Sequence, residues 1–193
     1  MNSIEKIEQF AKDNYVPIAR KQTIEFIINL FKEKGYKSFL EIGTAIGYTS
    51  INVALIDPSI RILTLEYEEN RASIARQNFI DFNVEKQIKM IICDARFYHP
   101  DLYYDVIFID AAKKRNKYFL EKFSSRLNKG GTIIIDNMNL DDLWVDAKKE
   151  KKEEYDQVNK EFKEYILTLK EYKVEIYDHI GDGIAVLYKI DKN

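Results

Sequence analysis

The sequence is poor in residues that cross-link or interrupt a chain. Its 193 residues include one cysteine, three prolines and seven glycines. The lone Cys93 excludes an internal disulfide, and its apolar run KMIICDA favours a buried structural thiol. No repeat and no Pro/Gly/Ser-rich linker divides the chain. We therefore expect one domain over residues 1–193, in which residues 1–36 form a helical cap.

Long apolar runs and a strong net charge are also missing. No run approaches the roughly 20 apolar residues of a membrane span, and the charged start MNSIEKIEQFAKDNY lacks the apolar core of a signal peptide. The net charge of −2, with 46% hydrophobic and 32% charged residues, indicates a globular protein without a general attraction to nucleic acid. We expect a cytoplasmic protein that does not contact a membrane.

What the sequence does contain is an alternation of helices and strands. Apolar spacing from Ile4 and again from Ile24 predicts two amphipathic helices, the second ending at Gly35. From residue 37, short apolar strands alternate with helices expected over 50–56, 70–82 and 117–127, the last ending at Gly130 and Gly131. The predicted strands are KSFLEIG, RILTLEY, IKMIICDA, DVIFIDA and TIIIDN. This order predicts a doubly wound, Rossmann-like α/β fold with a parallel sheet covered on both faces.

The C-terminal third departs from simple alternation. The stretch KKEEYDQVNKEFKEYILTLKEY has one apolar helical face, and KVEIYDHI and GIAVLYKI follow it, joined by the short turn GDG. These two strands predict an antiparallel hairpin. A doubly wound sheet that ends in such a hairpin resembles the class I S-adenosylmethionine methyltransferase fold more than a nicotinamide dehydrogenase.

The stretch FLEIGTAIGYTS runs from the first predicted strand into the turn after it and contains two glycines. Gly43 and Gly47 allow close backbone approach to a ligand, and Glu41 offers an acceptor to an amine or hydroxyl. The stretch lacks the last glycine of the dinucleotide fingerprint, and no G-K-[ST] follows. A phosphate-binding loop is therefore disfavoured.

Acidic residues end the next two strands. Glu66 follows the glycine turn at close to the spacing of about 20 residues at which an acid reaches a ribose hydroxyl, and Asp94 is placed to meet an adenine amino group. Each acid alone is equally consistent with a helix N-cap. Taken in order, they favour a nucleoside ligand without a diphosphate, such as S-adenosylmethionine.

Two further strands end in acids, at Asp110 and at Asp136 followed by Asn137. If these strands are neighbours, three oxygen ligands meet at one edge of the sheet. Oxygen ligands without Cys or His select Mg²⁺, or else Mn²⁺ or Ca²⁺. Helix capping and a solvent-exposed turn are the alternative roles for the same residues.

Together, FLEIGTAIGYTSI, IDAAK, DNM and GDGIAV resemble the metal-dependent O-methyltransferase family that includes catechol and caffeoyl-CoA O-methyltransferases. NYVPI and EIGTAIGY are most similar to bacterial tRNA 5-hydroxyuridine methyltransferases. The resemblance implies a homodimer, a Mg²⁺ site at Asp110, Asp136 and Asn137, and catalytic roles for Lys113, as the base, and for Asp110. It also implies a methyl-donor site lined by Val16, Thr49, Glu66, Asp94 and Asp110.

The resemblance implies 5-hydroxyuridine at the tRNA wobble position as the acceptor, with a small catechol-like molecule as the alternative. The metal does not choose between them, because both present neighbouring oxygens to it. The segment MNLDDLWVDAKKE lacks the basic and glycine residues that often flank the acceptor pocket in the family. A tRNA would need cations for phosphates and aromatics that stack a base. Candidates are Arg20, Lys21, Lys113, Lys114, Arg115 and Lys117, with Tyr15, Tyr48 and Trp144; Lys148, Lys149, Lys151 and Lys152 are more typical of a solvated helix face.

Two other classes of function compete with this interpretation. A nicotinamide-dependent oxidoreductase is disfavoured by the missing glycine and by the terminal hairpin. A nucleoside-binding module without catalysis would use the acids only as caps, and it predicts that Asp136→Ala leaves function unchanged.

Overall fold

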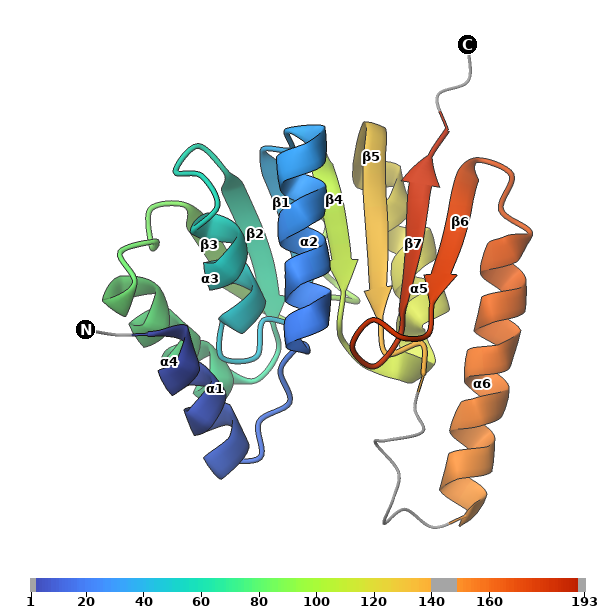
Figure 1. Ribbon diagram of the computed structural model, residues 1–193, viewed down its shortest axis with the longest axis horizontal. Helices are drawn as coiled ribbons and strands as arrows, with labels where there is room; N and C mark the ends of the chain where they lie inside the picture. The colour runs from blue at the N-terminus through green and yellow to red at the C-terminus, as the bar shows by residue number, and fades with distance from the viewer. Residues whose placement is uncertain (1–2, 140–148, 191–193) are drawn as a thin grey trace.

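The computed structural model describes residues 3–139 and 149–190. Its strands form one seven-stranded sheet in the order β3-β2-β1-β4-β5-β7-β6 (Figure 1). The first five strands pair in parallel, whereas β7 pairs antiparallel with both β5 and β6. Both the doubly wound sheet and the terminal hairpin are thereby confirmed. The strands are β1 (Ser38–Ile42), β2 (Arg61–Glu66), β3 (Ile88–Ile92), β4 (Tyr104–Ile109), β5 (Leu127–Asp136), β6 (Tyr172–Tyr177) and β7 (Ile184–Lys189).

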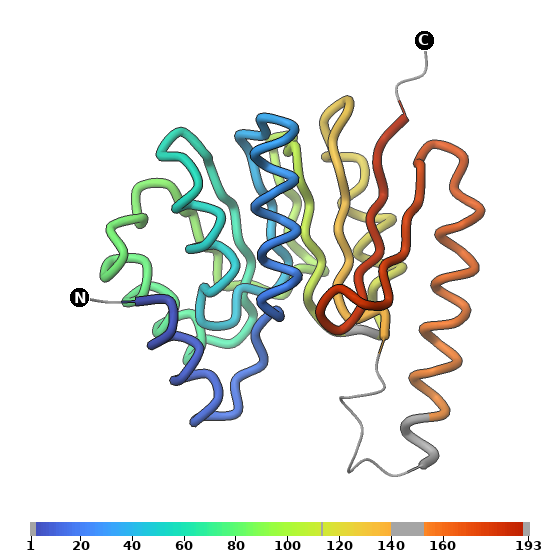
Figure 2. The backbone as a smooth tube through the Cα atoms, viewed as in Figure 1, coloured from blue at the N-terminus to red at the C-terminus, as the bar shows by residue number. Residues whose placement is uncertain are grey.

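Helices cover both faces of the sheet. One face packs against α1 (Ile4–Asp13), α2 (Lys21–Lys34), α3 (Tyr48–Ala54) and α4 (Glu69–Asp81). The other face packs against α5 (Asn116–Phe123) and α6 (Lys149–Leu167), with the short 3₁₀ turns η1 (Lys113–Arg115) and η2 (Ser124–Arg126) on either side of α5. Figure 2 shows α2 crossing in front of the sheet and α6 standing beside the β6 edge.

The central strands are buried on both sides, which explains their continuous apolar runs. Phe39 of β1 and Phe108 of β4 stack on the α2 face, with ring centroids 6.3 Å apart. Their neighbours Leu40 and Ile107 point to the opposite face, toward α5. Within the described ranges, no helix is long and apolar enough to cross a bilayer.

The prediction for Gly130 and Gly131 was wrong. Both lie inside β5, and α5 ends at Phe123 rather than continuing to residue 127. Gly130 has a φ of +65°, and a Cβ on Gly131 would lie 2.8 Å from the carbonyl oxygen of Asp105. The pairing of β5 with β4 is irregular at this point. The glycines therefore permit a bulged start of the strand instead of ending a helix.

Candidate active site

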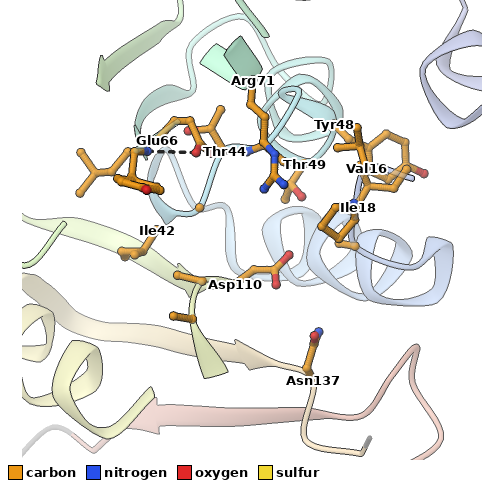
Figure 3. Close-up of a pocket in the computed structure, with 18 of the residues that line it drawn as sticks. Val16, Ile18, Ile42, Thr44, Tyr48, Thr49, Glu66, Arg71, Asp110 and Asn137 are labelled. Atoms are coloured by element: carbon orange, nitrogen blue, oxygen red, sulfur yellow. Dashed lines mark hydrogen bonds between the residues drawn. The ribbon is translucent and has the colours of Figure 1, made fainter. Parts of the chain in front are cut away.

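A cavity of about 980 Å³ lies at the carboxyl ends of the parallel strands, beneath α1 and the loop that follows it. Its lining includes the turn after β1, the ends of β2 and β3, and the ends of β4 and β5 (Figure 3). In a doubly wound sheet, this is the edge at which ligands bind. We call the turn at residues 43–49 with Glu66 and Asp94 the β1–β2 side of the cavity. We call Asp110 and Asn137, together with Asp136 behind them, the β4–β5 side.

The glycine turn on the β1–β2 side is shaped by the protein itself. The amides of Gly43 and Thr44 both donate to the carbonyl of Leu65, at 3.0 and 3.2 Å. Gly43 has a φ of +104°, and a Cβ there would lie 2.1 Å from the carbonyl oxygen of Asp110. Between the glycines, Ala45 also has a positive φ, of 47°. Gly43 lines the cavity as predicted, and its missing side chain lets β4 approach the turn.

Glu41 is a predicted ligand-binding residue that the structure does not place in the cavity wall. It is 1% exposed, and its carboxylate accepts hydrogen bonds from Ser50 Oγ at 2.5 Å and Thr64 Oγ1 at 2.6 Å. Burial raises the pKa of Glu41 to about 7, although these hydrogen bonds act in the opposite direction. Its position links β1, β2 and α3 behind the glycine turn, so it supports the cavity from outside.

Glu66 does line the cavity, at the end of β2. One carboxylate oxygen accepts from the amide of Ala45 at 2.7 Å, and the other accepts from the amides of Tyr67 and Glu68 at 3.0 and 2.9 Å. Glu66 thus accepts backbone N–H groups, as a capping residue does, while lying in the cavity wall. Backbone donors fix the orientation of the carboxylate, which keeps further acceptor capacity.

Asp94 and Arg96 form the adjoining part of the wall. The guanidinium of Arg96 donates to the Asp94 carboxylate at 2.5 to 3.0 Å, and these hydrogen bonds lower the pKa of Asp94. The Arg96 amide also donates to it at 2.9 Å. Asp94 is therefore ionised and oriented, with Arg96 as a partner that the sequence analysis did not identify.

Val16 and Thr49 both lie in the cavity wall, from the loop after α1 and from the first turn of α3. Glu8 of α1 fixes the relation of these elements: the Tyr48 hydroxyl donates to it at 2.7 Å, and Lys21 of α2 pairs with it at 2.7 Å. Tyr48 is 3% exposed. It is therefore held as a structural link rather than offered to a stacking base.

On the β4–β5 side, the structure brings the ends of two neighbouring strands together. Ile109 pairs with Ile135, so Asp110 and Asp136 follow at matching positions. Asp110 and Asn137 line the cavity, and Figure 3 shows the Asn137 side chain rising toward Asp110. Asp136 lies behind them at 3% exposure and accepts the amide of Asn137 at 2.9 Å.

The charges of this group fit a divalent cation. Burial is the main cause that raises the pKa of Asp136, and the nearby carboxylate of Asp110 adds to it. Two close carboxylates are costly in a buried place unless a cation compensates them. Within residues 3–139 and 149–190, no cluster of three or more His, Cys, Asp or Glu side chains forms a metal site. Asn137 adds an amide oxygen beside the two carboxylates, in the cavity wall.

The predicted base Lys113 lies in η1, directly after the β4 end, but its side chain is outside the described part of the structure. Its neighbours Ala112 and Arg115 line the cavity. Trp144 and Lys148 also fall outside the described residues, as do the side chains of Lys149, Lys151 and Lys152.

Several cavity residues were missed by the sequence analysis. Arg71 reaches in from α4 (Figure 3), Asp182 from the β6–β7 turn, Lys12 from α1 and Tyr67 from the end of β2. Cys93 also lines the wall and is only partly buried, whereas the sequence had favoured a buried structural thiol.

Comparison with known proteins agrees with this geometry. A family model described as O-methyltransferase matches residues 4–190. Catechol O-methyltransferase of Mycobacterium tuberculosis is 32% identical over 103 residues, which are 51% of this chain and 47% of that protein. The Niastella koreensis enzyme of the same name is 34% identical over 119 residues, 57% of this chain and 53% of that protein. The chain thus spans about half the length of these curated relatives.

Solved structures extend the likeness over the whole fold. A Staphylococcus aureus protein with the provisional name caffeoyl-CoA O-methyltransferase has a TM-score of 0.87 at 32% identity, covering 98% of this chain and 93% of that chain. A Bacillus cereus O-methyltransferase solved with SAH has a TM-score of 0.78 at 24% identity, covering 96% and 90%, and shows the shared fold. With its sheet order, its cavity and the family match over residues 4–190, the chain belongs to the O-methyltransferase family.

Proposed function

We propose that this protein transfers the methyl group of S-adenosylmethionine to an acceptor oxygen held beside a divalent cation, Mg²⁺ by preference. The observation that carries the proposal is the single cavity, which joins the β1–β2 side to the β4–β5 side. A nucleoside site and a hard-cation site in one cavity are what such a transfer requires. The structures of relatives in complex with SAH support the choice of donor.

The donor would lie along the β1–β2 side. Glu66, fixed by three backbone amides, would accept the ribose hydroxyls, and Asp94 would meet the adenine. Val16, Gly43 and Thr49 would pack around the sulfonium end, close to Asp110. Glu41 would act only through Ser50 and Thr64.

The acceptor would lie on the β4–β5 side. Asp110, Asp136 and Asn137 would hold the cation, which when bound lowers the pKa of a coordinated hydroxyl and fixes its direction. The acceptor oxygen forms a bond to the methyl carbon as the carbon–sulfur bond breaks, leaving S-adenosylhomocysteine. Lys113 would accept the hydroxyl proton. Most of the rate enhancement would come from positioning of the two reactants.

For the acceptor we infer 5-hydroxyuridine at the wobble position of tRNA, on the similarity of NYVPI and EIGTAIGY to the tRNA enzymes. The surroundings of the cavity support an RNA partner in part. Six cations line the cavity, and the rings of Tyr15 and Tyr67 are 94% and 76% exposed nearby. The six are Lys12, Arg20, Lys21, Arg71, Arg96 and Arg115.

A small catechol-like acceptor is the second candidate, favoured by two observations. Four of the six cationic side chains already form ion pairs within the chain, with Asp182, Glu8, Glu68 and Asp94. The cavity therefore attracts phosphate groups less strongly than six unpaired cations would. The relatives at 32% and 34% identity also carry the name catechol O-methyltransferase. A homodimer remains a prediction by analogy, and a cytoplasmic location remains a prediction from the sequence.

The test is methyl transfer from labelled S-adenosylmethionine into tRNA from a strain that lacks this gene, with and without EDTA, followed by nucleoside analysis. Label recovered as 5-methoxyuridine, and lost with chelator, is the expected result. Label in a catechol but not in tRNA would replace the acceptor and keep the reaction. No transfer to either, together with no binding of S-adenosylhomocysteine, would overturn the proposal.

A further inference from the structure

The turn between β6 and β7 contains the motif GDG, to which the proposed reaction assigns no role. The turn lies between two elements that are distant in sequence, the start of α2 and the segment just after β5 (Figure 1). Each of its glycines faces one of these elements. Both have positive φ angles, +56° at Gly181 and +77° at Gly183.

On the β5 side, the turn binds the residues that directly follow Asn137. The amide of Met138 donates to the carbonyl of Gly183 at 2.9 Å, and the amide of Asn139 donates to the carbonyl of Asp182 at 2.7 Å. A Cβ on Gly183 would lie 2.7 Å from the Asn139 nitrogen. Glycine is therefore required here for the two backbone hydrogen bonds to form.

On the α2 side, the turn is fixed by packing and charge. A Cβ on Gly181 would lie 2.4 Å from Thr23 Oγ1, and Arg20 Nε donates to both carboxylate oxygens of Asp182, at 2.9 and 3.0 Å. The turn is thus held on one side by α2, which lets it hold the backbone after β5 on the other.

The backbone of Asn137 lies in the left-handed region, with a φ of +63°. Asparagine adopts this region more readily than most non-glycine residues, and the contacts on either side of Asn137 fix it there. The backbone N–H of Asn137 donates to the Asp136 carboxylate, and the backbone N–H groups of the next two residues donate to the turn. With both sides of Asn137 held, its side chain is directed into the cavity.

We propose that the β6–β7 turn, residues 180–183, is the positioning element for Asn137: its backbone carbonyls hold residues 138 and 139 so that the Asn137 amide oxygen stays in place for the cation. This inference rests on the proposed function, since it takes Asn137 as a metal ligand. Gly183 is a positioning residue and would not itself touch the cation or the substrate.

The test is Mn²⁺ binding, measured by electron paramagnetic resonance, in the wild type and in Asn137→Ala, Gly183→Ala and Gly35→Ala. Gly35 is the matched control, because it has a φ of +68° and no atom within 4 Å of an added Cβ. Supporting shells of metal ligands are worth roughly 10–100-fold in affinity. We expect Gly183→Ala to weaken Mn²⁺ binding at least tenfold, as Asn137→Ala does, and Gly35→Ala to bind like the wild type.

Hydrogen exchange of the Met138 and Asn139 amides in the wild type provides a second measurement that needs no variant. Slow exchange supports the inference, and exchange at the rate of free amides overturns it. If Asn137→Ala weakens Mn²⁺ binding and Gly183→Ala does not, the positioning role alone is overturned. If the wild type binds no Mn²⁺, the metal centre of the proposed function is overturned and the inference with it.

Discussion

The two sides of the cavity are built in different ways. On the β1–β2 side, the hydrogen bonds that hold Glu66 and Glu41 join Ala45 to Glu66, Ser50 to Glu41 and Thr64 to Glu41, separated by 21, 9 and 23 positions. On the β4–β5 side, Asn137 depends on a turn more than 40 residues later, and that turn is anchored to Arg20 across 162 positions. The carboxylates of the first side are thus held from neighbouring elements of the chain, whereas the second side depends on contacts across most of its length.

The difference implies that the two sides can be damaged separately. Donor binding should survive changes on the β4–β5 side, and metal binding should survive changes on the β1–β2 side. The two sides meet where Gly43 lies against the backbone carbonyl of Asp110, so a larger residue at position 43 should disturb both sides. Variants on either side therefore test how independent the two halves are.

The largest expected effect is the loss of transfer in Asp136→Ala. Removal of a buried cation ligand should lower the rate roughly a thousandfold, because about 4 kcal/mol of transition-state stabilisation disappears. Binding of S-adenosylhomocysteine, measured by calorimetry, should stay within a factor of two to three of the wild-type value. The exposed Asp101→Asn is the control. Unchanged activity in Asp136→Ala would favour the binding module without catalysis.

Next in size is a pH effect at Glu41, on the β1–β2 side. Burial raises its pKa in the folded state from the ordinary 4.5 to about 7, so the folded state holds the proton more tightly than the unfolded state. Stability therefore falls as pH rises through this interval and levels off above it. In Glu41→Gln this fall should be absent. The difference between the two proteins in free energy of unfolding should change by on the order of 2–3 kcal/mol between pH 5 and 8.

Urea denaturation at both pH values measures this difference, with the exposed Glu33→Gln as control. An equal pH slope in wild type and Glu41→Gln would mean that Glu41 is ionised in the folded protein across the whole range.

A smaller effect is expected at Glu66. In Glu66→Gln the new amide group can no longer accept all three backbone N–H donors, and it offers one acceptor fewer to a ribose. Affinity for S-adenosylhomocysteine should fall about tenfold, or roughly 1.4 kcal/mol, with Mn²⁺ affinity unchanged. Glu69→Gln, exposed in the first turn of α4, is the matched control. A parallel loss of Mn²⁺ affinity would contradict the independence of the two sides.

The smallest effect belongs to the ion pair between Arg20 and Asp182. The Arg20 side chain is 51% exposed, so Arg20→Gln should cost less than about 1 kcal/mol of unfolding free energy, and less again at high salt. Denaturation at low and high salt measures this. A loss above about 2 kcal/mol would show that the pair, more than the glycine contacts, holds the turn.

The same contrast explains what could be predicted from the sequence. Apolar periodicity is a local property, so the strands, their parallel order and the terminal hairpin were predictable. The acids at strand ends were placed by the same reasoning, because strand ends of a parallel sheet meet at one edge. Glu66, Asp94, Asp110 and Asn137 accordingly lie in the cavity wall.

The misses have physical causes. Glu41 points from β1 into the protein interior, where the hydroxyl groups of Ser50 and Thr64 donate to its carboxylate. The spacing of residues in the sequence does not predict such partners. Gly130 and Gly131 resemble a helix end, although the close approach of Asp105 explains at least Gly131. Arg71 and Asp182 enter the cavity through helix orientation and hairpin packing, which depend on the assembled fold.

The left-handed backbone at Ala45 has a consequence for engineering this chain toward altered methyl donors. Alanine at a φ of 47° is strained, so glycine at that position should be accepted with a gain in stability. Position 43 allows no such freedom, because even a methyl group would collide with the Asp110 backbone. In a randomised library of this loop, folded variants should retain glycine at position 43 and accept several small residues at position 45. Position 45 is therefore the one at which the cavity can be enlarged.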